Sequence, residues 1–275
     1  MSTRPIREVE IGVSDLDRSL AFYTDLLGLA PLPAGDADDG HRSARMSAGT
    51  AVLRLIEIGA EGRTDDWITD DLQKGFRHIG FKVSDTDAAA ARLRDAGVQF
   101  HLEPLDAEGG VRIAFFRDPD GVMLELIQGD LQYHKVWSEE QAADERSQGV
   151  PESPRFDHIA VTVEDLDKSL EFYTGALDYE VVGQLFQTRD PRGFVITYLR
   201  SENTVFEVFS YDSPKQPSPW QPGDDLLGFR AACLHCADAV EAEETASRLQ
   251  QAGASGETGD VYLSPDGVPL KLVVQ

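Results

Sequence analysis

Short stretches in which apolar and polar residues alternate recur along the chain, and each is followed by apolar residues at helical spacing. In Phe156–Val163 the alternation has period two, which predicts a half-buried strand with His158 on one face. Asp165 offers an N-cap, and apolar residues then recur at helical spacing over Leu166–Tyr173 until Gly175. The unit is therefore a strand followed at once by an amphipathic helix.

The same unit occurs near the start of the chain, between Ile6 and Leu29. The segments VSDLDRSLAFYTDLL and VEDLDKSLEFYTGAL correspond without a gap, so the chain is an internal duplication. Related strand–helix segments begin at Phe76 and at Gly228, and three further strands are expected after each helix. The pattern predicts an α+β fold of four strand–helix–three-strand units, two in each half.

The length of 275 residues suits two domains of ordinary size. We expect an N-terminal domain over residues 1–130, a linker over 131–154 with a short helix around Ser138–Arg146, and a C-terminal domain over 155–275. The fourth unit is shortened: Gly97 precedes Asp118 by 21 positions, whereas Gly253 precedes Ser264 by only 11. Losing a hairpin's worth of chain suggests that this unit no longer lines a working site.

The charge balance excludes one class of partner. Asp and Glu outnumber Lys and Arg by 49 to 25, a formal charge of −24, and such a surface repels the phosphates of nucleic acids. No apolar run is long enough to span a bilayer, and the first residues lack the apolar stretch of a secretory signal. The expectation is a cytoplasmic protein with no nucleic-acid or membrane partner.

The two cysteines frame the sequence CLHC, a spacing that invites a metal or redox interpretation. Cys233 and Cys236 lie on a predicted strand, however, where residues three apart point to opposite faces. We therefore expect two buried thiols without a metal.

A strand, a DLxxSxxFY helix, a strand that begins near a histidine and a closing DPDGxxxE strand together resemble the vicinal oxygen chelate superfamily. Its members include glyoxalase I, methylmalonyl-CoA epimerase, extradiol dioxygenases and the bleomycin and fosfomycin resistance proteins. The resemblance covers nearly all of the chain except the linker. It implies tandem domains with curved mixed sheets around a metal cleft, but it does not fix the reaction, because this fold hosts many activities.

In that family the first and last strands of each βαβββ unit can contribute metal ligands, and two units form one open site. Alignment of the units gives the following residues in chain order: Glu8 and Arg54, His78 and Glu125, His158 and Glu207, Ala231 and Lys271.

The pairing of the units decides which of these residues meet. If each half folded on itself, both sites would include a cation, which repels a divalent metal. Pairing the second unit with the third joins two imidazoles and two carboxylates without a cation, as in glyoxalase I, where ligands come from both sides of an interface. The leftover set of Glu8, Arg54, Ala231 and Lys271 is expected to hold an ion pair in place of a metal.

The resemblance to glyoxalase I implies a lyase or isomerase that acts on a small substrate through a metal-stabilised enediolate. His78 and His158 would be plain ligands, Glu125 the principal base, and Glu207 its partner across the metal. The ligand set accepts nickel, cobalt, zinc, manganese or iron, so the expected cofactor is one divalent ion of unknown identity. The protein is expected to be a monomer or a homodimer.

Two alternatives stay open. An extradiol-type dioxygenase would bind iron in the third and fourth units, where Ala231 and Lys271 replace two of that family's three ligands. A metal-free drug- or metabolite-binding protein would use an aromatic cleft, for which Trp220, Phe186, Phe194 and Tyr198 are candidates.

Three arginines in the third unit could pair with a substrate carboxylate, namely Arg189, Arg192 and Arg200.

Overall fold

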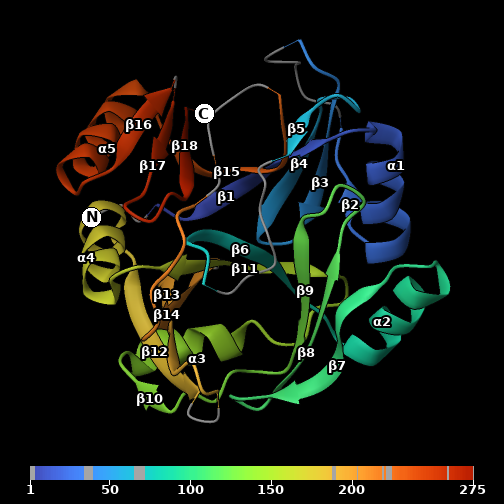
Figure 1. Ribbon diagram of the computed structural model, residues 1–275, viewed down its shortest axis with the longest axis horizontal. Coiled ribbons are helices and arrows are strands. Elements are labelled where there is room, and N and C mark those ends of the chain that lie inside the picture. Colours follow the sequence, from blue (N-terminus) through green and yellow to red (C-terminus); the bar gives the residue numbers. More distant parts are fainter. Residues whose placement is uncertain are drawn as a thin grey trace.

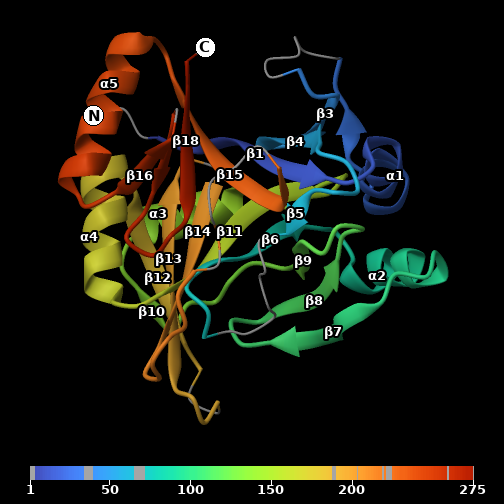
Figure 2. The same cartoon turned by 45° about the horizontal axis from the view of Figure 1, so that its top comes forward.

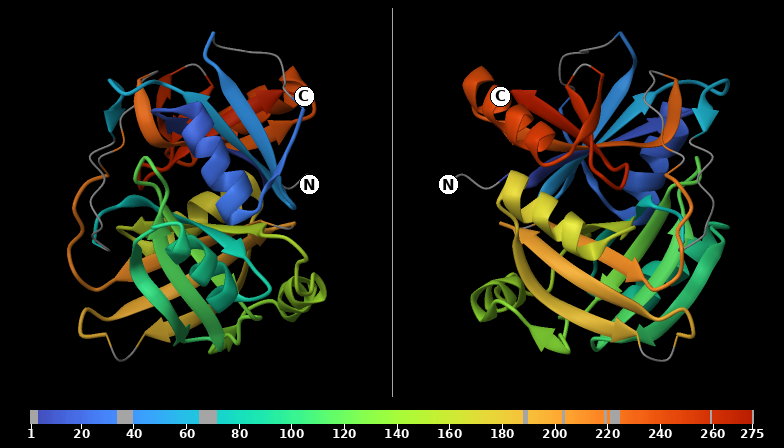
Figure 3. Two further views of the ribbon diagram at one scale, coloured as in Figure 1. Left: turned by 90° about the vertical axis from the view of Figure 1, so that its right-hand side faces the viewer. Right: turned by 60° about the vertical axis from the view of Figure 1, so that its left-hand side comes forward.

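The computed structural model covers residues 1–275 and describes 4–33, 40–64, 72–187, 190–202, 204–218, 220, 225–258 and 260–274. It contains two nine-stranded mixed sheets, one stacked above the other (Figure 3). The four predicted units are present, and the α+β fold with two curved sheets is confirmed.

The first sheet combines the first and fourth units, and its strands run in the order β16-β17-β18-β15-β1-β4-β3-β2, with β5 attached to β15. The first unit contributes β1 (Ile6–Val13), β2 (Ala30–Pro31), β3 (Ser43–Ala48) and β4 (Ala51–Glu57), followed by β5 (Arg63–Thr64). The fourth contributes β15 (Leu226–Cys236), β16 (Ser255–Thr258), β17 (Val261–Leu263) and β18 (Pro269–Val274). The fourth unit thus keeps its hairpin in a shortened form.

The second sheet combines the second and third units in the order β10-β12-β13-β14-β11-β6-β9-β8-β7 (Figure 1). The second unit contributes β6 (Gly75–Lys82), β7 (Phe100–Ala107), β8 (Val111–Arg117) and β9 (Met123–Gln128). The third contributes β11 (Arg155–Val163), β12 (Glu180–Gln187), β13 (Phe194–Ser201) and β14 (Thr204–Tyr211). The crossed pairing of the units is therefore confirmed. The division of the chain into two sequential domains stays a prediction.

Each unit starts its helix in the same way. An aspartate two or three residues after the strand accepts a hydrogen bond from the backbone N–H three residues further on, a cap that stabilises a helix by about 1 kcal/mol. These helices are α1 (Leu16–Ala21) with η1 (Phe22–Leu27), α2 (Thr86–Asp95), α4 (Leu166–Leu177) and α5 (Ala239–Gln251). Helices α4 and α5 lie together on one side of the molecule, and η1 contacts α2 on the other (Figure 2).

The first helix differs from the expected regular helix. Its second half, η1, is π-wound, and Gly28 ends it with a backbone φ of +94° that favours glycine. In the described part of the chain, no helix is both long and apolar enough to cross a bilayer.

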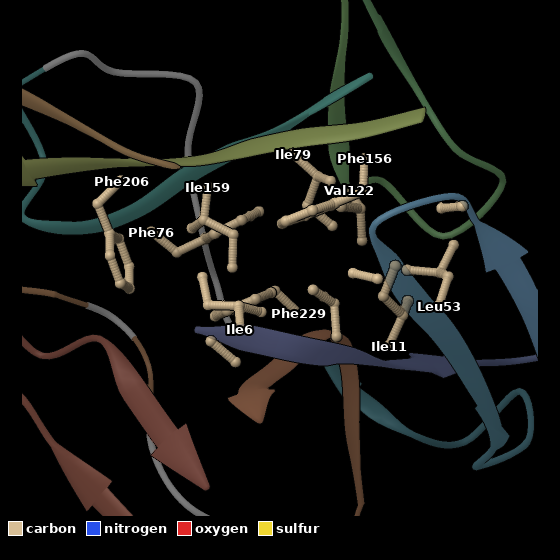
Figure 4. Close-up of a cluster of buried hydrophobic side chains, with 14 of the residues drawn as sticks. Ile6, Ile11, Leu53, Phe76, Ile79, Val122, Phe156, Ile159, Phe206 and Phe229 are labelled. Atoms are coloured by element: carbon tan, nitrogen blue, oxygen red, sulfur yellow. The ribbon is translucent and has the colours of Figure 1, made fainter. Parts of the chain in front are cut away.

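The main hydrophobic core lies between the two sheets. Phe76 of β6 stacks on Phe229 of β15 with ring centroids 4.0 Å apart, and Ile79 and Ile159 of the second sheet face Ile6 of the first (Figure 4). Because side chains alternate along a strand, the residues beside these core positions point to the opposite, concave face of each sheet. The polar candidates of the four units are on those concave faces.

The linker packs against the second sheet. Strand β10 (Lys135–Val136) pairs with β12 and forms the edge of the sheet, and α3 (Glu139–Ser147) covers nearby apolar residues with the buried Ala142. The helix was expected within one residue of these bounds. Strand β10 and the packing of α3 against the sheet were not expected. A two-residue strand is too short to show a hydrophobic period in the sequence.

Candidate metal centre

Four side chains from four strands converge on the concave face of the second sheet. His78 on β6 and His158 on β11 come from the two central strands, and Glu125 on β9 and Glu207 on β14 come from the strands on either side. One ligand atom of each lies within 4.8 Å of the others, and all four residues are buried. The structure thus brings together the four residues that were predicted to meet. We call this region, with the cavity beside it, the His/Glu cleft.

The separations of the ligand atoms suit a small cation. The two Nε2 atoms are 3.1 Å apart, and Glu125 Oε2 is 3.0 Å from each of them. Glu207 Oε2 is 3.3 Å from both. With bonds of about 2.1 Å, neighbouring ligands lie about 3.0 Å apart in an octahedron and about 3.4 Å apart in a tetrahedron. The four atoms are therefore spaced as ligands around one ion are spaced.

The hydrogen bonding also calls for a cation. Nδ1 of His158 lies 2.9 Å from Asp157 Oδ2, a partner that favours a proton on Nδ1 and leaves Nε2 as the atom that either carries a second proton or binds a metal. Lone pairs that face each other at 3.0 Å repel unless a positive charge lies between them. Glu207 Oε2 is buried and accepts no hydrogen bond of acceptable geometry. The donor set fits a divalent metal.

Protonation equilibria show the same demand for positive charge. Burial alone would raise the pKa of Glu125, but hydrogen bonds from His158 and His78 lower it to about 2. Burial alone would lower the pKa of His158, but Glu207, Asp157 and Glu125 raise it well above its usual value. The site attracts positive charge, whether as a proton or as a metal ion.

Two small residues make room for the imidazoles. In the antiparallel pair of β6 and β11, His158 stands opposite Gly80, and His78 stands opposite Ala160. A Cβ atom at Gly80 would lie only 2.1 Å from the His158 ring, so the ring occupies the space that any other residue would fill. Gly80 was not among the residues predicted from the sequence. Its signal was a glycine two positions after a ligand, on the same face of the strand.

Two other residues that hold the ligands were also missed. Tyr198 stands opposite Glu207 and donates its hydroxyl to Oε1 at 2.8 Å. Asp157 orients His158, and although burial would raise its pKa, Lys82 and His158 lower it to about 2. Asp157 had a signal in the sequence, because the other three units carry an arginine at its position: Arg7, Arg77 and Arg230.

A cavity of about 400 Å³ opens beside Glu125 and Glu207, between the strands that carry them and the outer strands of the sheet. Of the four aromatic residues that were candidates for a binding cleft, Phe194 and Tyr198 line the cavity. Trp220 and Phe186 are not in its lining: the Trp220 indole donates to the backbone of Phe229, and Phe186 stacks on His134.

The arginines proposed for a substrate carboxylate are engaged elsewhere where the structure describes them. Arg192 pairs with Asp190, and the buried Arg200 donates to the backbone of Gln141 in α3. Arg189 lies outside the described residues.

The first sheet has a second cleft, lined by Glu8, Glu10, Arg54 and Lys271, which we call the ion-pair cleft. The expected ion pair is present, but its anion is Glu10. Glu10 Oε1 lies 3.2 Å from Arg54 and 2.8 Å from Lys271, whereas Glu8 pairs with Arg45. Glu8, Glu10 and the buried thiol of Cys233 also lie close together. Cations already occupy the space beside both carboxylates.

Cys233 and Cys236 are buried free thiols, as predicted. Burial raises the pKa of Cys233 well above its usual value, so this thiol is not a ready metal ligand.

Comparison with known proteins supports the fold and the family. A probable lactoylglutathione lyase of Synechocystis is 37% identical over 127 residues, which are 43% of this chain and 90% of that protein. A lactoylglutathione lyase of Pseudomonas aeruginosa is 35% identical over 141 residues, 43% of this chain and 79% of that protein.

Solved structures extend the likeness of fold to nearly the full length. Glyoxalase I from Zea mays superposes with a TM-score of 0.69 at 21% identity, covering 99% of this chain and 92% of that one. A putative dioxygenase from Bacillus subtilis superposes with a TM-score of 0.64 at 15% identity, covering 99% and 86%. The profile of one superfamily matches residues 6–126 and 155–261. The chain belongs to the Glyoxalase/Bleomycin resistance protein/Dioxygenase superfamily.

Proposed function

We propose that the protein is a divalent-metal-dependent lyase or isomerase of the glyoxalase I type, with one active site in the His/Glu cleft. The observation that carries the proposal is the convergence of His78, Glu125, His158 and Glu207 beside a cavity of about 400 Å³. The names of the two relatives described above support the reaction class. The substrate is a small molecule with two neighbouring oxygens.

The two glutamates are held differently, which assigns their roles. Tyr198 anchors Glu207 through a hydrogen bond to Oε1, and this bond holds the carboxylate with its Oε2 3.3 Å from both imidazoles. Glu125 contacts the same imidazoles through Oε2 alone in the contacts that the structure describes. Glu125 is therefore freer to turn toward a substrate in the cavity.

A bound divalent ion would stabilise negative charge that develops on two neighbouring substrate oxygens. Glu125 takes the proton from the carbon beside those oxygens and returns it to the adjacent carbon. His78 and His158 keep their places because Gly80 leaves room for one ring and Asp157 orients it. The apolar walls of the cavity exclude water from the reacting carbons.

Metal analysis and calorimetry on the wild type and on His78→Ala and His158→Ala test the shared site. We expect either substitution alone to abolish high-affinity binding, because the ligands come from both halves of the chain. Glu8→Ala in the ion-pair cleft is the matched control and should leave binding intact. Full metal content in one histidine variant with loss in the other would refute a shared site.

Turnover is tested with hemithioacetals of methylglyoxal and phenylglyoxal formed with several thiols. Glu125→Gln should retain the metal and lose turnover by at least about 100-fold, the contribution of a general base. Oxygen uptake with catechols after iron loading, without isomerisation, would instead favour the dioxygenase alternative.

A further inference from the structure

The wall of the His/Glu cleft is mostly apolar and comes from the outer strands of both units. Beyond Glu125 and Glu207, apolar side chains bound the cavity on both sides. They include Ile113 and Phe115 on the β7–β9 side, and Phe194, Ile196 and Phe209 on the β12–β14 side. Such a surface gains free energy when it covers an apolar ligand, about 25 cal/mol for each Å² removed from water. A charged peptide would leave much of this gain unused.

Aromatic rings stand closest to the ligand residues. Phe115 meets His78 edge to face, with ring centroids 4.9 Å apart. Phe209 lies 6.3 Å from His78 on the other side, and Phe194 continues the row at 5.9 Å from Phe209. A flat ring attached to the reacting oxygens would have aromatic partners at the distances that favour such contacts.

The charged residues in the lining are mainly acidic. Asp106 on β7 and Glu108 in the turn that follows it belong to the lining; Asp106 pairs with Arg112 at 2.9 Å, and Glu108 Oε2 lies 3.6 Å from His134 Nε2. Among the described lining residues the cation is Arg77, which donates to the Tyr211 hydroxyl at 3.0 Å and lies 4.1 Å over the Phe209 ring. Arg77 can pair with one substrate carboxylate beside the ligand residues. A second carboxylate beside the turn after β7 would meet Glu108.

We infer that the His/Glu cleft takes a vicinal-oxygen substrate whose remaining part is apolar, preferably aromatic, and carries at most one carboxylate. This inference rests on the proposed function and names the substrate class of that site. It separates this cleft from one built for glutathione adducts, because glutathione carries two carboxylates. The whole-chain charge of −24 opposes the approach of such a ligand as well.

A binding experiment tests the charge part of the inference. S-benzylglutathione and its diethyl ester share an aromatic group and differ only in their two carboxylates. Both are titrated calorimetrically into the metal-loaded and the metal-free protein. The diester should bind at least about tenfold more tightly to each form, because it does not bring a second carboxylate toward Glu108. Tighter binding of the free acid, or no binding of either ligand to either form, overturns the inference.

Variants locate the effect. Glu108→Lys should reverse the preference toward the free acid, and Glu140→Lys, on the exposed side of the linker helix, is the matched control. Phe194→Ala should weaken the diester by about tenfold, whereas Phe186→Ala on the neighbouring strand β12, outside the cavity lining, should not. Arg189→Gln is included because Arg189 lies outside the described residues. A free-acid preference that disappears in Arg189→Gln would assign the carboxylates to Arg189 and overturn the inference.

The outcomes separate the inference from the proposed function. If the protein retains no metal but the metal-free form still prefers the diester, the proposed function fails and the inference about the cleft holds. If the metal-loaded protein turns over the glutathione hemithioacetal faster than hemithioacetals of uncharged thiols, the function holds and the inference fails.

Discussion

The two clefts have the same strand topology and opposite electrostatic solutions. In the His/Glu cleft, two carboxylates and two imidazoles converge with no cation among them, so the site needs a positive charge from outside. In the ion-pair cleft, Arg54 and Lys271 stand where the glutamate ligands would be, and Glu10 binds both. The second cleft supplies from its own side chains the positive charge that a metal would bring.

The comparison shows that a few positions decide whether a cleft presents metal ligands or an internal ion pair. Glu8 and Ala231 replace the two histidines, and each exchange also alters the small residue opposite. In the His/Glu cleft, Gly80 stands opposite His158, and the equivalent pair in the ion-pair cleft is Cys233 opposite Glu8. Likewise, Ala160 stands opposite His78, and the equivalent pair is Glu10 opposite Ala231. Once the space for imidazole rings is filled by larger side chains, the histidines cannot return by single substitutions.

The largest expected effect is a loss of metal affinity caused by a substitution that displaces a ligand of the His/Glu cleft without replacing it. Gly80→Ala places a methyl group 2.1 Å from the His158 ring and must displace it. We expect metal affinity to fall by more than about 100-fold, beyond the 10–100-fold typical of changes to a ligand's partner. Calorimetric titration of the chelator-treated protein measures this loss.

Cys233→Ala is the matched control, because Cys233 occupies the equivalent position in the other sheet. It should leave metal affinity unchanged. Wild-type affinity in Gly80→Ala would show that the ring has room elsewhere and that the comparison of the two clefts is mistaken.

The next effect is on stability and falls on the ion-pair cleft. Glu10→Gln removes the anion that Arg54 and Lys271 share, and Arg54 is only 11% exposed. Breaking a buried pair costs about 3–5 kcal/mol, and the 30% exposure of Lys271 reduces this to about 2–3 kcal/mol. Urea denaturation measures the loss in unfolding free energy, while metal affinity should be unchanged. A variant as stable as the wild type would mean that the ion pairs do not hold this cleft together.

A smaller loss of metal affinity is expected when the hydrogen-bond partner of His158 in the His/Glu cleft is changed. Asp157→Asn keeps the shape of the side chain that faces His158 Nδ1 but removes its charge, so metal affinity should fall by about 10–100-fold. Asp167→Asn, at an exposed position in the first turn of α4, is the control. If Asp157→Asn binds metal as the wild type does, the imidazole is oriented by packing alone.

Much of this comparison could be predicted from the sequence, because it depends on duplication and on alternation along strands. The four ligand candidates and the crossed pairing follow from aligning the units and from charge repulsion. The role of Glu10 did not follow, because Glu10 is not at a position equivalent to a ligand. Glu10 is two residues after Glu8 and shares its face, so period two would have found it.

Other features depend on tertiary contacts that leave no local pattern. Tyr198 meets Glu207 only through the register of β13 and β14, and that register is set by the hairpin between them. The docking of α3 against the second sheet combines the buried Ala142 with hydrogen bonds from Arg200 to Gln141 and from Tyr133 to Glu145. The sequence predicts such a helix but not the surface that it covers.

The smallest expected effect concerns the two equivalent turns DPDG and SPDG, of which only the first has a titratable side chain at its first position. Asp118 in the DPDG turn accepts a hydrogen bond from Tyr23 at 2.8 Å, whereas the equivalent SPDG turn has Ser264. Burial raises the pKa of Asp118 to about 6 even though hydrogen bonds from Tyr23 and Val122 oppose the rise. A raised pKa means that the folded state binds this proton more tightly than the unfolded state does. The contribution of Asp118 to stability is therefore highest below about pH 4 and falls as the pH rises to about 6.

Asp118→Asn removes this titration and keeps an oxygen for the backbone N–H groups of Asp120 and Val122. Relative to the wild type, the variant should gain about 1–2 kcal/mol in unfolding free energy between pH 4 and pH 7, below the ceiling of about 3 kcal/mol that a shift of two pKa units sets. Urea denaturation at a series of pH values measures the difference. Ser264→Ala should show no such pH-dependent difference, because serine does not titrate in this range. Parallel stability curves for Asp118→Asn and the wild type would mean that Asp118 stays ionised in the folded protein, and the two turns would then differ only in their hydrogen bonds.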